Sequence, residues 1–135
     1  TGWLEARLFG SLRLARSTGP ATDRGELMRY LAELPWAPHA LLQNRSLSFR
    51  QIDRNSVEVS APCADGPACV RLVFAGTDVA RIEADDRPRI EGRRIVPRPW
   101  TGRFADWREL GGVRVPTRAE VSWILPSGPF ECWRG

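Results

Sequence analysis

The chain has 135 residues, 42% of them hydrophobic and 27% charged, which favours a globular domain and argues against a disordered segment. Its apolar runs fall far short of the roughly 20 residues that a membrane-spanning helix needs. The formal net charge is +4 and all 20 basic residues are arginine, a composition bias that argues against a nucleic-acid partner, for which proteins usually combine lysine with arginine.

The N-terminal part of the chain has a strand pattern. Apolar and polar residues alternate over residues 2–16, and Gly10 breaks the alternation as a bulge or tight bend would. Residues 17–20 have the composition of a loop. The chain starts at Thr1 without a methionine and ends within a strand pattern. We therefore expect a single domain, residues 1–135, that is the C-terminal part of a longer chain.

One main α-helix is predicted at about residues 24–34. Asp23 can cap its first turn, Glu26 follows three residues later as in a capping box, and Pro35 ends it. At about 1.5 Å per residue, such a helix is roughly 16 Å long and can cross three or four strands. An apolar stripe on one face contains Leu27, Leu31 and Leu34.

Short strands and turns are predicted for the rest of the chain, after one helical turn at residues 40–42. Residues 85–99 interrupt the strand pattern with three prolines and five arginines, so we expect a loop there, and long loops often carry function. Gly111 and Gly112 predict a tight hairpin. The predicted strands are residues 46–52, 57–59, 70–74, 80–84, 101–110, 113–115, 119–125 and 130–134.

One helix followed by many short antiparallel strands predicts an α+β fold. A sheet of about 6–8 twisted strands does not stay flat, so we expect a curved antiparallel half-barrel wrapped around the helix. Four of the six tryptophans lie in the last third of the chain: Trp100, Trp107, Trp123 and Trp133. Such large side chains can fill the core or line a ligand pocket between helix and sheet.

Four blocks of the chain, residues 29–38, 99–104, 115–123 and 130–135, resemble those of a bacterial protein family of unknown function. The resemblance implies a longer N-terminus, and Cys132 stands where that family usually has an aromatic residue. The curved sheet with its glycine hairpin also resembles, in architecture, the LolA/LolB-like lipoprotein carriers of the bacterial envelope. That likeness implies a location in the envelope and an acyl chain held between sheet and helix.

Three functional hypotheses follow from these patterns. In the first, the chain is a non-catalytic binding module for a lipid or another apolar ligand, with Arg103 or the loop at 85–99 at the pocket mouth. In the second, it is a hydrolase in which His39, the sole histidine, acts with Glu33 or Asp106. In the third, it is an interaction domain completed by another chain, or by a second copy, at an open sheet edge. The candidate ligand-binding residues are Leu31, Trp36, His39, Arg103, Trp107 and Trp123.

The cysteines and acidic residues give weaker signals. Cys63 and Cys69 flank a turn and can form a disulfide across a hairpin, or remain two unpaired thiols. Cys132 is expected to be a small buried side chain. No metal site or cofactor is predicted, because only the acidic cluster Glu83, Asp85 and Asp86 suits a hard cation, and arginines near it in the sequence can pair with it.

Overall fold

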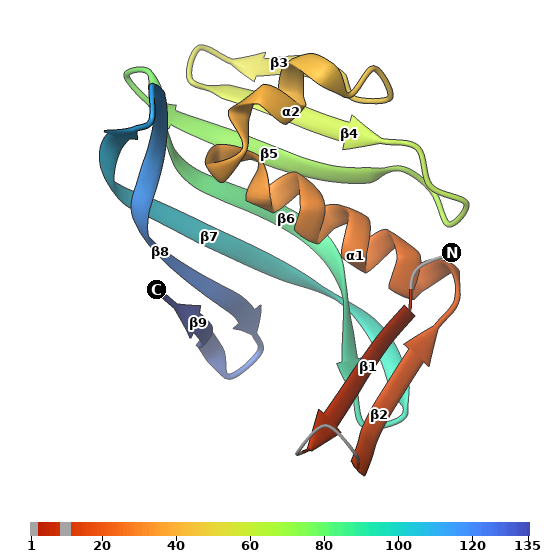
Figure 1. The fold of residues 1–135 in the computed structure, drawn as a ribbon. Coiled ribbons are helices and arrows are strands. Elements are labelled where there is room, and N and C mark those ends of the chain that lie inside the picture. The colour runs from red at the N-terminus through yellow and green to blue at the C-terminus, as the bar shows by residue number, and fades with distance from the viewer. Residues whose placement is uncertain (1–2, 9–11) are drawn as a thin grey trace.

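The computed structural model describes residues 3–8 and 12–135, with side chains from residue 19 onward. Three helical segments follow one another along the chain between two sheets (Figure 1). They are α1 (Pro20–Glu33), the 3₁₀ helix η1 (Leu34–Trp36) and α2 (Pro38–Gln43). The predicted break at Gly10 lies outside the described residues.

The larger sheet has seven antiparallel strands, and each strand pairs with the next one along the chain. Its strands are β3 (Ser48–Asp53), β4 (Ser56–Ala61), β5 (Ala68–Ala75), β6 (Asp78–Glu91), β7 (Arg94–Leu110), β8 (Val113–Leu125) and β9 (Gly128–Arg134). A separate pair of strands, β1 (Trp3–Leu8) and β2 (Leu12–Thr18), precedes α1. An α+β fold with a curved antiparallel sheet is therefore confirmed, although the helical part has three segments.

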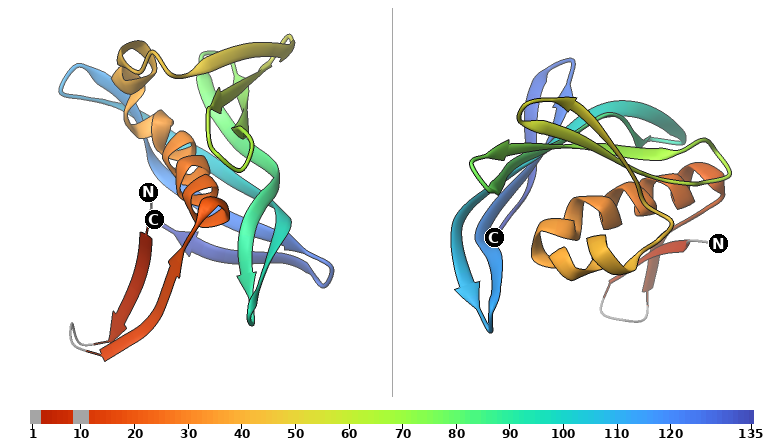
Figure 2. Two further views of the ribbon diagram at one scale, coloured as in Figure 1. Left: turned by 90° about the vertical axis from the view of Figure 1, so that its right-hand side faces the viewer. Right: turned by 90° about the horizontal axis from the view of Figure 1, so that it is seen from above.

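The large sheet curls so that α1 lies across its concave face (Figures 1 and 2). Met28 and Leu31 on the helix are almost completely buried, and so are Val59, Val70 and Ile82 on the strands below. Neighbouring strand residues alternate between this core and the outer face, as the period of two in the sequence requires. The core thus lies between α1 and strands β4 to β6 and continues to Trp100 and Phe104 on β7.

The helix begins at Pro20, earlier than the predicted start at residue 24. Pro20 occupies a first-turn position, where its missing N–H costs no hydrogen bond and its fixed φ suits a helix. Gly19 precedes it with a φ of 119°, which favours glycine. The loop expected at residues 17–20 is reduced to Gly19, because β2 ends at Thr18 and α1 begins at Pro20. Asp23 lies in the first turn rather than at the cap.

The prediction of a loop at residues 85–99 is wrong. These residues form the two arms of a long hairpin between β6 and β7. Pro88 lies opposite Pro97, and a short turn follows at Gly92, whose φ is 62°. β5 pairs with β6 only as far as Glu83, so within residues 3–8 and 12–135 no strand pairs with the outer side of the β6 arm beyond it. Proline is tolerated there, because a strand without a neighbour on one side needs no N–H on that side.

The short turns of the sheet are confirmed at the predicted positions. The hairpin between β7 and β8 turns through Gly111 and Gly112, which have φ angles of 57° and 79°. Positive φ at both positions is the requirement that makes two glycines a hairpin signal. None of the helices in the described part of the chain is both long and apolar enough to cross a membrane.

Candidate functional site

A groove of about 400 Å³ lies between the C-terminal half of α1 and the concave face of β7, β8 and β9. The main contacts of the helix are with β4, β5 and β6, although Trp100 and Phe104 on β7 also belong to the buried core. We call it the aromatic groove. Its floor and walls include Trp36, Arg87, Trp100, Phe104, Val121 and Trp133.

The floor of the aromatic groove comes from alternate residues of β7. Trp100 and Phe104 both point to the concave face, and Gly102 lies between them. A β-carbon at Gly102 would lie 3.1 Å from Ile82 Cγ2 and 3.6 Å from the Trp100 ring. Because glycine has no side chain, the Trp100 indole can lie close to the backbone here. On β8, Val121 pairs with Gly102 and continues the floor.

Trp36 on η1 forms one end wall of the aromatic groove. Its indole N–H donates a 3.0 Å hydrogen bond to the backbone oxygen of Pro116. Its ring contacts Phe104 and Trp133 edge to face, with centroids 5.0 and 6.2 Å apart. These contacts attach the end of the helical region to β8 and β9. A second groove of about 460 Å³ begins on the other side of Trp36, beside Thr117.

Arg87 reaches the aromatic groove from β6. Its guanidinium carbon lies 4.8 Å from the Trp100 ring centroid and 5.2 Å from that of Trp123, so the cation is stacked on two indoles. Among the described residues, it has no hydrogen-bond or ion-pair partner, and its Nε atom is buried. Burial lowers the pKa of Arg87 from its ordinary value, because the charged form loses water.

The helix side of the groove carries an ion pair. Arg29 donates a 3.1 Å hydrogen bond to Glu33 and lies 3.6 Å from Glu26. The hydrogen bond that Arg29 donates to Glu33, together with the negative charge of Glu33, raises the pKa of Arg29. Because Arg29 and Glu33 neutralise each other, the residues that line the groove carry one excess positive charge, that of Arg87.

The comparisons with known proteins identify a family. A family model described as "Family of unknown function (DUF6544)" matches residues 1–135. The chain belongs to this family. The expected membership of a family of unknown function is thereby confirmed, while the likeness to LolA/LolB-like carriers stays a prediction. A search of the curated proteins and a search of the solved structures each returned no match.

One of the six predicted ligand-binding residues of this DUF6544 member, Trp36, lines the aromatic groove and forms its end wall. Trp123 does not line the groove, but its ring centroid lies 5.2 Å from the guanidinium carbon of Arg87, which does. Leu31, on α1, is completely buried in the core and is not among the residues that line the aromatic groove. The helix and the strands that carry the tryptophans thus come together, but Trp36 and Arg87, rather than Leu31, line the aromatic groove.

The other three predicted residues lie elsewhere. His39 is exposed on α2, with no hydrogen-bond or ion-pair partner in the described part of the chain. Arg103 is exposed and lies on β7 between two buried residues of the concave face, so its side chain is on the outer face. Trp107 is partly buried against the core, and its buried indole N–H has no acceptor among the described residues.

Phe104 was not predicted as a groove residue, and Arg87 was predicted only as part of the 85–99 segment at the pocket mouth. The alternation of Trp100, Gly102 and Phe104 was the available signal for one aromatic face. Arg87 was hidden in a segment expected to be a loop, so no face of the sheet could be assigned to it.

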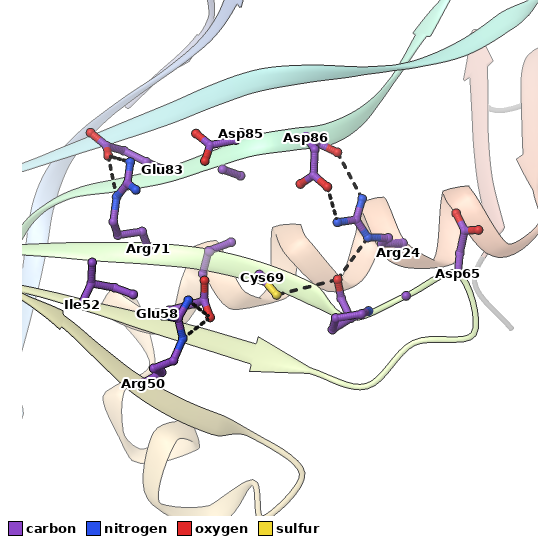
Figure 3. Close-up of a pocket in the computed structure, with 14 residues that line it drawn as sticks. Arg24, Arg50, Ile52, Glu58, Asp65, Cys69, Arg71, Glu83, Asp85 and Asp86 are labelled. Atoms are coloured by element: carbon purple, nitrogen blue, oxygen red, sulfur yellow. Dashed lines mark hydrogen bonds and ion pairs between the residues drawn. The ribbon is translucent and has the colours of Figure 1, made fainter.

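A larger hollow, of about 880 Å³, is separate from both grooves. It lies on the outer face of β3 to β6 and reaches the N-terminal half of α1 (Figure 3). Its charges are largely paired. Arg50 contacts Glu58 at 3.0 Å, and Arg71 contacts Glu83 at 2.6 Å. The hydrogen bond to Glu83 raises the pKa of Arg71. We interpret the ion pairs that line this hollow as a network that joins neighbouring strands.

Arg24 closes the gap between β5 and β6 at the edge of this hollow. Its side chain, 14% exposed, extends from α1 and lies 2.7 Å from the carboxylate of Asp86. It also donates to the backbone oxygens of Asp86 and Pro67. Asp86 and Glu83, two of the three acidic residues weighed as a cation cluster, are thus occupied by arginine. No group of three or more metal-ligating side chains occurs within the described residues.

The three cysteines are free thiols in the structure. Cys63 and Cys69 are both half-buried, and burial raises the pKa of the Cys69 thiol. A disulfide between them stays a prediction. Cys132 is exposed, contrary to the expectation of a buried side chain, because it lies on the outermost strand, β9, and lines the open groove. Its thiol lies 3.5 Å from the backbone oxygen of Val121.

Proposed function

We propose that this chain is a non-catalytic binding module that holds an apolar molecule in the aromatic groove. The observation that carries the proposal is a hollow lined mainly by aromatic side chains, at which Trp36 and Trp133 remain exposed. Ligand pockets are mostly apolar hollows of about 300–1,000 Å³ with a few polar groups, and the aromatic groove, at about 400 Å³, falls in this range.

The exposed aromatic walls of the groove support this proposal. The floor residues Trp100 and Phe104 are buried as part of the core. Trp36 and Trp133, which form part of the groove walls, remain 37% and 48% exposed. Large aromatic side chains that stay exposed together often mark an interaction site, since each would gain from further burial.

The predicted likeness to LolA/LolB-like carriers agrees with this proposal as an analogy of architecture. A curved sheet with a helix on its concave face is the arrangement in which those carriers hold acyl chains. The proposal extends the analogy to a lipid or another apolar ligand, and to a location in the cell envelope.

The test uses native mass spectrometry of the purified protein, followed by organic extraction, and titration with the neutral apolar dye phenylnaphthylamine. We expect a co-purifying apolar molecule, or dye binding with a marked rise in dye fluorescence. Val121→Phe should reduce binding, because the added ring occupies the floor of the groove. Ile124→Phe, on the outer face of the same strand, is the matched control and should bind as the wild type does.

Two results together would overturn the proposal: no added mass in the native spectrum, and no dye binding by the wild-type protein. Equal dye binding by the wild type and Val121→Phe would show that the dye binds elsewhere, which also contradicts the proposal. Circular dichroism of both variants establishes that they are folded.

A second candidate function is an interaction domain, because the large sheet has two outermost strands, β3 and β9. Phe49 and Ile52 on β3 and Phe130 on β9 are exposed. Unpaired sheet edges with apolar side chains favour strand addition by another chain or a second copy. Light scattering after size-exclusion chromatography tests self-association, and a monomer at all concentrations would contradict pairing between copies.

A further inference from the structure

Arg87 differs from the other arginines whose side chains the structure describes. Arginine residues at ten positions form ion pairs with carboxylates. Those without such a pair are exposed, except for Arg87. Arg87 therefore combines partial burial with the absence of a carboxylate partner.

A partly buried guanidinium without a carboxylate partner destabilises the folded state unless a hydrogen-bond acceptor reaches it. Removing a charge from water is unfavourable unless it is paired and hydrogen-bonded. Stacking on Trp100 and Trp123 stabilises the cation through the ring faces, but provides no acceptor for its N–H groups. Arg24 shows the other outcome in this chain: its similarly shielded side chain has one carboxylate and two backbone oxygens as acceptors.

We propose that the ligand of the aromatic groove is a single-chain amphiphile whose carboxylate binds the guanidinium of Arg87. This inference rests on the proposed function and adds the chemical class of the ligand. The carboxylate accepts hydrogen bonds from the planar guanidinium fork, a charge-assisted and often bidentate geometry. The apolar chain covers Phe104, Val121 and Trp133 on the floor and wall of the groove.

The charges around the groove agree with an anionic head group. Glu33 lines the helix side and Glu26 lies nearby, but both carboxylates contact Arg29. Arg89 also lies over Trp123, at 5.6 Å, and contacts Glu91 at 2.7 Å. Arg87 is thus the cation that remains available at the groove. A volume of about 400 Å³ is near the lower end of the range for ligand pockets, which favours one acyl chain over a two-chain lipid.

The experiment measures displacement of phenylnaphthylamine from the full chain by dodecanoate and by dodecanol, at neutral pH and below their aggregation limits. Both molecules have the same chain, so the difference between them isolates the head group. A hydrogen bond to a charged group is worth enough to change affinity about tenfold to a hundredfold. We expect the wild type to bind dodecanoate more tightly than dodecanol by about this factor.

Three variants locate the effect. Arg87→Met keeps an apolar side chain on the two indoles and should remove the preference for dodecanoate while still binding dodecanol. Arg87→Lys keeps the charge and should retain part of the preference. Arg94→Met is the matched control, since Arg94 is exposed on the same hairpin and has no ion pair within the described residues, and it should behave as the wild type does.

The outcomes separate this inference from the proposed function. If the wild type binds neither molecule and no dye, the proposed function fails and the inference with it. If the wild type binds both molecules equally, or if Arg87→Met keeps the preference for dodecanoate, the inference alone is overturned. Should Arg87→Met fail to fold, a weaker preference for dodecanoate in Arg87→Lys but not in Arg94→Met supports the inference, and an unchanged preference in Arg87→Lys overturns it.

Discussion

The contribution of Trp36 to stability can be calculated from its surroundings. About two-thirds of its surface is buried, since 37% is exposed, and a tryptophan side chain has roughly 200 Å² to bury. At about 25 cal/mol per Å², this burial is worth about 3 kcal/mol. Its hydrogen bond to Pro116, of 3.0 Å, adds about 1 kcal/mol. We therefore expect Trp36→Ala to lower the free energy of unfolding by about 3–4 kcal/mol.

The comparison variant is Trp36→Phe, which keeps most of the ring contacts with Phe104 and Trp133 but lacks the N–H. It should cost only about 1–2 kcal/mol. Urea unfolding followed by far-ultraviolet circular dichroism measures both free energies without depending on tryptophan fluorescence. A cost below about 1 kcal/mol for Trp36→Ala, or equal costs for the two variants, would refute the reasoning, because η1 would then not be held to the sheet by this side chain.

Three further changes test other parts of the fold. Leu31 is 0% exposed and Leu42 is 89% exposed, so Leu31→Ala should lower the free energy of unfolding by about 3–5 kcal/mol and Leu42→Ala by less than about 0.5 kcal/mol. Similar costs for the two variants in urea unfolding would contradict the placement of α1. Gly102→Val should reduce both the melting temperature and dye binding, because a β-carbon at this position would lie 3.1 Å from Ile82. An unchanged melting temperature would count against this packing. Hydrogen bonds from two arginines hold the pKa of Glu91 at about 2 instead of 4.5, so the stabilisation that Glu91 gives is present above about pH 4.5 and is lost as the pH falls toward 2. Over this pH range the melting temperature should fall less for Glu91→Gln than for the wild type, and an equal fall in both would contradict the ion-pair geometry.

The sequence predicted most strands and turns because local chemistry determines them. Gly111 and Gly112 must adopt positive φ in a tight hairpin, and no other residue type does so as readily. The buried face of the helix followed from the spacing of Leu27, Leu31 and Leu34. These signals depend on neighbours within a few residues, so they needed no knowledge of the rest of the fold.

The hairpin arm and the site could not be predicted in the same way. Pro88 and Pro97 are typical of a loop, and are tolerated in strands only because the arm has no strand pairing beyond it. The groove depends on how far α1 extends over the sheet, which is set by contacts distant in sequence. The position of Arg87 between two indoles required the strand assignment that the prolines concealed.

The most direct test of ligand binding in the aromatic groove is a crystal structure of the protein grown with dodecanoate. We predict electron density for the chain along Phe104 and Val121, with the carboxylate about 3 Å from the guanidinium of Arg87. Density for dodecanoate only on the outer face of the sheet, or a groove closed by protein side chains with Arg87 paired to Glu26 or Glu33, would contradict the account.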